Sequence, residues 1–249
     1  MNSKKLVLVT GGTRGIGRSI VEKLAKEEYK VAFTYCTNSE LANSFSKNLI
    51  NKGYDVFPFH LNQGSSESIL SCLSNIKKKF NSDVSVLINN AAISQEKPFD
   101  EITNSDWDKM FKTNLQGPFF LIQNVIKKMV KNNFGKIINI SSVGGQWGGF
   151  NQVHSAATKA ALINLTMSVA KIYSGKGINC NAIAIGLVKT DMIVNELKSV
   201  SGKNKVKNIP IGRVGETNDV SNTVSYLISE KASYITGQTI NLNGGMYFG

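Results

Sequence analysis

Short β-branched segments alternate with longer segments of helical periodicity along almost the whole chain, and this alternation is the strongest constraint on the fold. Strands are predicted at residues 6–10, 31–35, 55–60, 84–89, 136–140, 179–184 and 239–242. Helices are predicted at 15–28, around 41–49 and 69–76, and at 106–132, 153–174 and 219–229. Strands separated by helices form βαβ units with right-handed crossovers. The sequence therefore predicts an α/β fold of three layers, with a doubly wound parallel sheet of about seven strands.

The composition and the lack of linkers predict a single domain spanning residues 1–249. Apolar residues make up 41% of the chain and charged residues 18%, which excludes disordered, collagen-like and coiled-coil classes. No internal repeat or Pro/Gly/Ser-rich segment divides the sequence. No apolar stretch has the length of a membrane span, so a membrane is not an expected partner.

The cysteines and histidines form neither a metal-binding nor a disulfide pattern. Cys36, Cys72 and Cys180 are odd in number and lack CxxC spacing, and His60 lies far from His154. A zinc site is therefore not expected. This use of cysteine suits a reducing compartment, and the apolar run after the basic N-terminus is too short for a signal peptide. We expect a cytoplasmic protein.

The chain is strongly basic. Its 29 Lys and Arg against 17 Asp and Glu give a formal net charge of +12. This excess favours acidic partners in general, although a solvated lysine-rich surface explains it equally well. No arginine-rich cluster or basic–aromatic pattern accompanies the charge, so nucleic acid is not an expected partner.

A glycine-rich turn follows the first predicted strand and opens the first helix. Gly11, Gly15 and Gly17 have the spacing GxxxGxG. Glycines allow the backbone to approach a phosphate closely, and free N–H groups at a helix start bind a diphosphate. The turn therefore predicts a dinucleotide site in a Rossmann fold. A competing P-loop pattern places Arg18 where a lysine belongs, and arginine does not replace that compact charge.

The end of the second predicted strand favours NADP over NAD. A dinucleotide fold that binds NAD normally has an acidic residue there for the ribose diol. Residues 34–37 contain no carboxylate, and the next one along the chain is Glu40. A 2′-phosphate would meet no repulsion at this position, and Arg14 is well placed to pair with it.

Several segments resemble motifs of the short-chain dehydrogenase/reductase family, in that family's order and over essentially the whole chain. Besides the GxxxGxG turn, they are Asn89-Asn90-Ala91-Ala92, Lys112-Thr113-Asn114, Ile138-Asn139-Ile140-Ser141-Ser142, Ile235-Thr236-Gly237-Gln238 and Asn243-Gly244-Gly245. Within the family the chain looks most like 3-oxoacyl-acyl-carrier-protein reductases. Two further positions differ from the family pattern. Ile185 precedes Gly186 where the family usually has a proline, and Ala92 replaces a glycine. Both differences are interpreted as changes in packing.

This resemblance implies an NADP-dependent oxidoreductase that reduces a carbonyl such as a 3-oxoacyl thioester. It implies that Ser142 holds the carbonyl, that Lys159 binds ribose and lowers the pKa of a catalytic tyrosine, and that Asn114 holds a water. Asn62 matches an adenine-contacting position and Thr190 a carboxamide-contacting one. The cofactor-binding positions, including those from the glycine turn and the second strand, are Gly11, Thr13, Arg14, Gly15, Ile16, Gly17, Tyr35, Asn62, Asn90, Ala91, Lys159, Val188 and Thr190.

The resemblance breaks at the catalytic tyrosine. Ser155 lies four residues before Lys159, and none of the seven tyrosines lies four residues before a lysine. Because general acid catalysis supplies about 10²–10⁴-fold, a loss of that order is expected. Three interpretations stay open: a reductase of reduced activity or one protonated through water or by His154, an inactive nucleotide-binding subunit partnering an active homologue, and an altered residue in an ordinary reductase. A Ser155/Lys159 hydrolytic dyad has neither the SxxK nor the GxSxG pattern.

The resemblance also implies macromolecular partners. An acyl carrier protein is acidic, which suits the basic chain. Lys176 matches a basic position that related reductases use for docking, whereas Asn133 stands where a second basic residue is expected. The family further implies a homo-tetramer. The lysine-rich segment 192–208 has no clear periodicity and is predicted to cover the active site as a lid.

Overall fold

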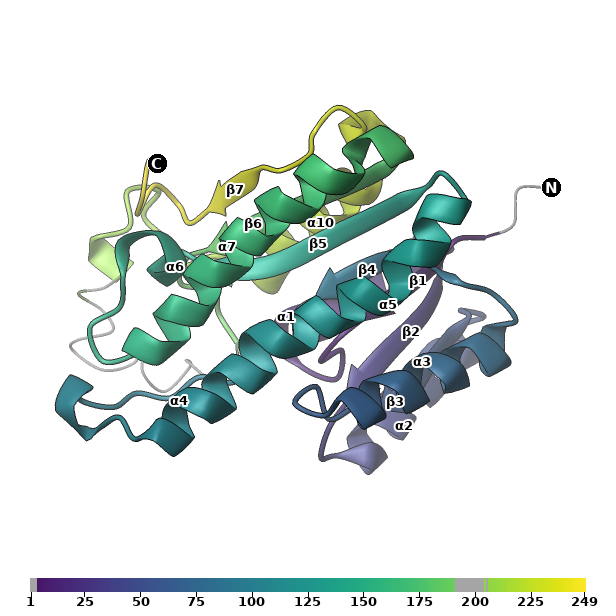
Figure 1. Cartoon of the computed structure of the whole chain (residues 1–249), viewed down its shortest axis with the longest axis horizontal. Helices are drawn as coiled ribbons and strands as arrows, with labels where there is room; N and C mark the ends of the chain where they lie inside the picture. The colour runs from purple at the N-terminus through teal and green to yellow at the C-terminus, as the bar shows by residue number, and fades with distance from the viewer. Residues whose placement is uncertain (1–3, 191–203, 205) are drawn as a thin grey trace.

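The computed structural model describes residues 4–190, 204 and 206–249, and its strands form one parallel sheet (Figure 1). The sheet order is β3-β2-β1-β4-β5-β6-β7. The strands are β1 (Leu6–Val9), β2 (Lys30–Tyr35), β3 (Val56–His60), β4 (Val84–Asn89), β5 (Gly135–Ser142), β6 (Ile178–Ile185) and β7 (Thr239–Leu242). The order reverses between β1 and β4, as in a doubly wound Rossmann-type sheet. The predicted fold class is confirmed.

Helices connect the strands and cover both faces of the sheet. They are α1 (Gly15–Lys26), α2 (Ser39–Asn51), α3 (Ser66–Phe80), α4 (Asn104–Phe111), α5 (Gly117–Lys131), α6 (Gly144–Trp147), α7 (Val153–Tyr173) and α10 (Thr217–Ile228). A π-helical turn, Lys112–Gln116, joins α4 to α5. Shorter 3₁₀ turns occupy Phe99–Glu101, Ser174–Lys176 and Glu230–Ala232.

The sheet separates two apolar cores. Val7 and Val9 of β1 pack with residues of α1, α2 and α10, whereas Leu6 and Leu8 pack with residues of α3, α5 and α7. Successive side chains of a strand point to opposite faces, so an uninterrupted apolar strand feeds both cores. In Figure 1 the second group of helices lies on the near side of the sheet.

Side chains at the helix starts fix where several helices begin. Asn38 accepts the N–H of the third residue of α2, and Ser65 does the same for α3. Thr103 and Asp106 form a reciprocal capping box at the start of α4. These caps satisfy N–H groups that have no partner within the helix. They therefore fix the residue at which each connecting helix begins.

Three predicted boundaries are wrong in ways that matter for the site. The first helix ends at Lys26 instead of residue 28, because Glu28 has a left-handed backbone with φ 64°. The fifth strand continues past residue 140 to Ser142, because its ladder with β6 continues to Ile185. The long helix predicted at 106–132 begins at Asn104 and is interrupted by the π-helical turn.

Within the part of the chain that the structure describes, no helix combines the length and the apolar character needed to cross a membrane. The same residues contain no cluster of three His, Cys, Asp or Glu side chains arranged for a metal ion. Most of the predicted lid, residues 192–208, lies outside the described residues. The single domain of residues 1–249 and the cytoplasmic location stay predictions.

Candidate active site

The turn between β1 and α1 is held against both neighbouring strands. The N–H of Gly11 donates to Thr34 Oγ1 at 3.1 Å, and that of Gly12 donates to the Thr34 carbonyl at 2.9 Å. A Cβ on Gly17 would lie 2.1 Å from the Gly11 carbonyl oxygen and 2.6 Å from Asn90 Nδ2. No side chain fits in that approach, so glycine at position 17 is required by packing before any ligand is considered.

The first turn of α1 has no side-chain cap, unlike α2, α3 and α4. Arg14 occupies its N-cap position in an extended conformation, and no acidic residue lies in the first turn. The N–H groups that open the helix therefore keep their capacity to bind an anion, and the helix dipole favours negative charge there. This uncapped helix start fits a diphosphate.

Thr10 and Asn90 join this turn to the end of β4. Thr10 Oγ1 accepts the N–H groups of Asn90 and Ala91 at 3.0 and 2.9 Å. Asn90 Nδ2 donates in return to the carbonyls of Thr10 and Gly11, at 2.8 and 3.2 Å. The predicted residues Gly11, Asn90 and Ala91 thus share one rigid corner at the point where the strand order reverses. The role of the Thr10 hydroxyl was not predicted.

The residues predicted for the adenosine half lie along the neighbouring strand ends. Tyr35 ends β2 half-buried, with its ring 5.8 Å from that of His60. Asn62 is exposed just past β3 and accepts the Gly64 N–H at 3.1 Å. Arg14 is exposed, which leaves its guanidinium open to a ligand.

Arg18 does not act as a P-loop cation. Its Nε donates to Glu22 at 3.0 Å, and its guanidinium carbon lies 4.6 Å from the centre of the Phe45 ring. Both contacts run along α1 and toward α2, so the structure favours the dinucleotide interpretation of the glycine turn over the P-loop.

Asn114 lies in the π-helical turn and is buried. Its Oδ1 accepts the Ile93 N–H and its Nδ2 donates to the Ile93 carbonyl, both at 2.9 Å. The same Nδ2 lies 3.4 Å from Thr158 Oγ1, which donates to the Ser155 carbonyl at 2.7 Å. The turn therefore connects the loop after β4 to the first turns of α7. π-Helical turns occur frequently at functional sites.

Gln63 holds the π-helical turn in place. Its Nε2 donates to the carbonyls of Ala91 and Thr113 at 3.2 and 2.8 Å, while its Oε1 is buried without a hydrogen-bond partner among the described residues. A Cβ on Gly117 would lie 2.3 Å from Gln63 Cγ. No sequence pattern signals this contact, because neither residue belongs to a motif.

Lys159 is partly buried on α7 and reaches β5. Its Nζ donates to the Ile140 carbonyl at 2.7 Å, and Ser141 Oγ donates to the Lys159 carbonyl at 3.0 Å. Burial lowers the pKa of Lys159 to about 8, because the ammonium form loses hydration. An amine with such a pKa exchanges its proton near neutral pH.

Ser142 and Ser155 lie close to this lysine. Ser142 ends β5 two residues after Ile140, and its Oγ accepts the Gly144 N–H at 3.1 Å, which leaves its own hydroxyl hydrogen free to donate. Ser155 is almost wholly buried one helical turn before Lys159. Gly144 and Gly145 bring α6 against α7, since a Cβ on Gly145 would lie 2.7 Å from the Lys159 backbone. The four predicted catalytic residues thus stand on α7 and on two elements that contact it, β5 and the π-helical turn.

The residues after β6 return to the glycine turn. Val188 forms an isolated parallel bridge with Gly215. The Thr190 methyl lies 3.3 Å from where a Cβ on Gly15 would be, so Thr190 stands beside the start of α1. A residue predicted to contact the carboxamide therefore lies beside a glycine of the turn predicted to bind the diphosphate.

His154 belongs to a polar network on the loop before α4. Its Nε2 lies 2.9 Å from Gln95 Oε1, and Gln95 Nε2 donates to Asp106 at 3.0 Å. Asp106 also accepts from Lys97 at 2.7 Å and from Thr103, and these donors lower the pKa of its carboxyl group. Because the carboxylate only accepts, the Gln95 amide nitrogen must face it, and the Gln95 oxygen takes the Nε2 hydrogen of His154.

The chain end packs on α6. The rings of Trp147 and Tyr247 meet edge to face with 6.2 Å between their centres. Asn243 Nδ2 donates to the Tyr247 carbonyl at 3.2 Å, and Asn241 Nδ2 to the Gly249 carbonyl at 2.8 Å. Residues 243–249 thus help to hold α6 beside the end of β5.

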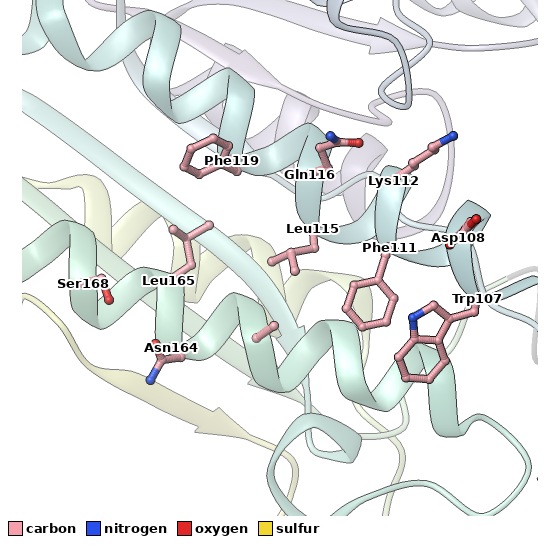
Figure 2. A pocket seen from close by; sticks show the side chains of 11 residues that line it. Trp107, Asp108, Phe111, Lys112, Leu115, Gln116, Phe119, Asn164, Leu165 and Ser168 are labelled. Carbon is pink, nitrogen blue, oxygen red and sulfur yellow. The ribbon is translucent and has the colours of Figure 1, made fainter. Parts of the chain in front are cut away.

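A groove of about 670 Å³ lies on a different surface, between α4–α5 and α7 (Figure 2). Trp107 and Phe111 are stacked in it with 4.7 Å between ring centres, and their side chains extend toward α7. None of the predicted site residues lines the groove, whose lining is Trp107, Asp108, Phe111, Lys112, Leu115, Gln116, Phe119, Ala161, Asn164, Leu165 and Ser168.

Comparison with known proteins agrees with this geometry. A family model described as enoyl-(acyl carrier protein) reductase matches residues 11–247. The 3-oxoacyl-(acyl-carrier-protein) reductase FabG of Staphylococcus aureus is 40% identical over 250 residues, covering 99% of this chain and 100% of the relative. The fold and these matches define an oxidoreductase of the Rossmann type. The chain belongs to the short-chain dehydrogenase/reductase family.

Relatives from distant bacteria give the same result. The protein of the same name from Aquifex aeolicus is 41% identical over 244 residues, covering 98% of this chain and 97% of its own length. That of Haemophilus influenzae is 37% identical over 243 residues, covering 98% of both chains. The predicted family resemblance is confirmed over the whole chain.

We predict that Gly17→Ala destabilises the protein by about 1–3 kcal/mol, because the added methyl overpacks the contact with the Gly11 carbonyl. Urea denaturation measures the change. Gly175→Ala is the matched control, since its Cβ would meet nothing within 4 Å. Equal stability of the two variants would contradict the close approach described for the glycine turn.

Proposed function

We propose that this protein is an NADPH-dependent reductase of a 3-oxoacyl thioester carried on an acyl carrier protein. The observation that carries the proposal is the convergence of an uncapped α1 start, Ser142, Lys159 and Asn114 at one sheet edge in a chain homologous to FabG reductases. Ligands of doubly wound sheets bind outside the carboxyl ends of the strands, at the point where the order reverses.

In this proposal the corner between β1 and β4 binds the cofactor. The first N–H groups of α1 bind the diphosphate, Arg14 and Tyr35 border the adenosine ribose, and Asn62 contacts adenine. Asn90, Ala91, Val188 and Thr190 border the nicotinamide half. When bound, NADPH supplies the hydride. Lys159 has donors left for a ribose hydroxyl, because its contact with Ile140 uses one of three N–H bonds.

Ser142 holds the carbonyl of the substrate. Its Oγ already accepts the Gly144 N–H, so the hydroxyl hydrogen is directed to a second acceptor. Both polar atoms of the Asn114 side chain bind the Ile93 backbone, and its Nδ2 also contacts Thr158. These contacts fix the π-helical turn relative to α7. The substrate oxygen is thereby held before any proton transfer occurs, and orientation of this kind contributes to catalysis by itself.

In this proposal Ser155 stands where the family resemblance implies a catalytic tyrosine. We predict that Ser155→Tyr raises kcat for NADPH oxidation with a 3-oxoacyl thioester by about 10²–10⁴-fold, since a phenol is a far better acid than an aliphatic hydroxyl. Ser155→Phe is the control, because it adds the ring without the acid. If both native chain and Ser155→Tyr are inert toward 3-oxoacyl thioesters, the proposed reaction is wrong.

A second candidate function is an inactive nucleotide-binding subunit that partners an active homologue. Ser155 favours it, because a binding protein does not need the acid. Ser142 and Asn114 disfavour it, since neither is required to hold a dinucleotide. We therefore propose the reductase first, and the Ser155→Tyr measurement separates the two functions.

The cofactor preference rests on charge. Within the described residues, no carboxylate stands between the end of β2 and Glu40, and Arg14 is exposed beside the start of α1. We predict that NADP⁺ raises Tm more than NAD⁺, and that Arg14→Ala weakens NADP⁺ about tenfold or more while sparing NAD⁺. Lys26→Ala, at the exposed far end of α1, is the control. An equal or greater shift with NAD⁺ overturns the preference.

The acyl carrier protein is proposed as a partner on the basis of charge. The chain has a net charge of +12, and Lys176 lies in the exposed turn after α7. Oppositely charged surfaces accelerate encounter and fix orientation, more than they add affinity.

We also propose that the groove between α4–α5 and α7 is covered by a second copy of this chain. Trp107 and Phe119 are each 41% exposed, and they line the groove together with Phe111 and Leu115, so the exposed apolar surface is contiguous there. Asp108 and Lys112 border the groove with opposite charges, so a two-fold axis would place each against the other. A two-fold interface of this kind is one step toward the tetramer that the family implies.

Trp107→Glu is predicted to shift the native assembly to a smaller species, because the charge would be buried in the contact. Sedimentation velocity measures the distribution. Tyr234→Glu is the control, since Tyr234 is fully exposed away from the groove. An unchanged distribution for Trp107→Glu would show that another surface mediates the assembly.

A further inference from the structure

The π-helical turn that carries Asn114 contains a carbonyl that its own helix cannot satisfy. In this turn the N–H of Gly117 donates to the carbonyl of Lys112, five residues earlier. The next bond of this kind would join residue 118 to the carbonyl of Thr113, but residue 118 is Pro118, which has no N–H. Because the Gly117 N–H is already used, the helix offers the Thr113 carbonyl no donor of its own.

Gln63, in the loop after β3, supplies the missing donor. Its Nε2 donates to the Thr113 carbonyl at 2.8 Å and to the Ala91 carbonyl at 3.2 Å, so both hydrogens of the amide nitrogen are used. The residue packs closely on the start of α5, since a Cβ on Gly117 would lie 2.6 Å from the Gln63 carbonyl oxygen. One amide group therefore joins the loop after β4 to the π-helical turn.

We infer that Gln63 is a positioning residue for the proposed reaction, because it replaces the N–H that Pro118 lacks and so sets the place of Asn114. The inference rests on the proposed function, in which Asn114 belongs to the site and Ala91 borders the cofactor. Thr113 directly precedes Asn114, so the bond to the Thr113 carbonyl fixes the backbone on which Asn114 stands. Gln63 acts through Asn114 and not on the reacting atoms.

The other polar atom of Gln63 supports this role. The residue is only 6% exposed, and its Oε1 is buried without a hydrogen-bond partner among the described residues. A buried acceptor without a donor is unfavourable, and an apolar side chain of similar size would avoid that cost. The amide is therefore explained by its two donated hydrogen bonds and not by the space that the side chain fills.

The contacts of Asn114 show what a shift of the turn would disturb. Its Oδ1 accepts the Ile93 N–H at 2.9 Å, and its Nδ2 lies 3.4 Å from Thr158 Oγ1. Thr158 in turn donates to the carbonyl of Ser155 at 2.7 Å. A displaced turn would therefore change both the loop after β4 and the first turn of α7. The amide hydrogen of Ile93 reports directly on the position of Asn114.

The first test measures amide hydrogen exchange by NMR in the full chain without ligands. Gln63→Leu is expected to speed the exchange of the Ile93 N–H about fivefold or more relative to the amides of β1, because Asn114 Oδ1 is no longer held in place. A general loss of stability would speed both alike. Gln123→Leu, at an exposed position of α5, is the matched control and should change neither.

The second test restores the donor at its origin. Pro118→Ala returns an N–H to residue 118, which can then bond the Thr113 carbonyl within the helix. In the Pro118→Ala background, Gln63→Leu should therefore change the Ile93 exchange about twofold or less. This double-mutant cycle isolates the compensation between the two residues. Equal effects of Gln63→Leu in both backgrounds overturn the inference.

The third test measures the reaction in the Ser155→Tyr chain, which the proposed function predicts to be the more active one. Gln63→Leu is expected to lower kcat with a 3-oxoacyl thioester about tenfold or more, because a small misplacement of a site group is costly. The KM for the thioester should stay within about threefold, and Pro118→Ala should restore most of kcat. Circular dichroism gives the folded fraction, so that kcat is expressed per folded molecule.

The outcomes separate this inference from the proposed function. Unchanged exchange of Ile93 in Gln63→Leu overturns the inference, whether or not the chain is active. Faster exchange with an unchanged kcat in an active chain overturns it as well, because Gln63 is then only structural. Inactivity of both the native chain and Ser155→Tyr overturns the proposed function, and the Ile93 exchange alone then decides whether Gln63 positions Asn114. Should Gln63→Leu not fold, fast solvent exchange of the Gln63 side-chain amide in the native chain overturns the inference, and slow exchange supports it.

Discussion

The contact between the β1–α1 turn and the end of β4 is the constraint on which the site depends. The Gly11 carbonyl, Gly17 and Asn90 Nδ2 meet so closely that even one methyl group has no room. This approach sets the start of α1 at the place where the strand order reverses. The free N–H groups of α1 therefore face the same crevice as the polar side chains that end β4 and β5.

Polar groups on the near face of the sheet extend this rigidity to the other half of the site. Asn114 binds the Ile93 backbone with both of its polar atoms, and Gln63 joins that turn to Ala91. Lys159 fastens α7 to β5 in the same way. Buried polar groups are costly unless they are paired, so these contacts specify one arrangement of the helices and not merely a compact one.

The sheet order and the glycine turn were predictable because each depends on local patterns. Apolar strands alternating with helices allow few topologies, and the GxxxGxG spacing marks the close approach that Gly17 makes. The π-helical turn was not predictable in the same way. One inserted residue leaves the periodicity of residues 106–132 nearly unchanged, and the contact of Gln63 with Gly117 joins residues more than fifty positions apart.

The site residues also fall into two groups: those that a local sequence motif identifies, and those whose contacts join segments far apart in the chain. Ser142, Lys159 and Asn114 could be named from motifs, whereas the network from His154 through Gln95 to Asp106 appears only when the loop before α4 is placed on α7. Likewise, motifs marked the start of α1, but the structure was needed to show that Arg14, which has no hydrogen-bond acceptor in its side chain, holds the N-cap position. The functional roles of these residues stay predictions until they are measured.

The packing of the last seven residues has a practical consequence for handling the protein. Tyr247 rests on Trp147 of α6, and the carbonyl of Gly249 is bound by Asn241, so residues 243–249 support the short helix that follows Ser142. A bulky label attached within residues 243–249 would therefore loosen α6, although none of these residues is predicted to bind substrate or cofactor.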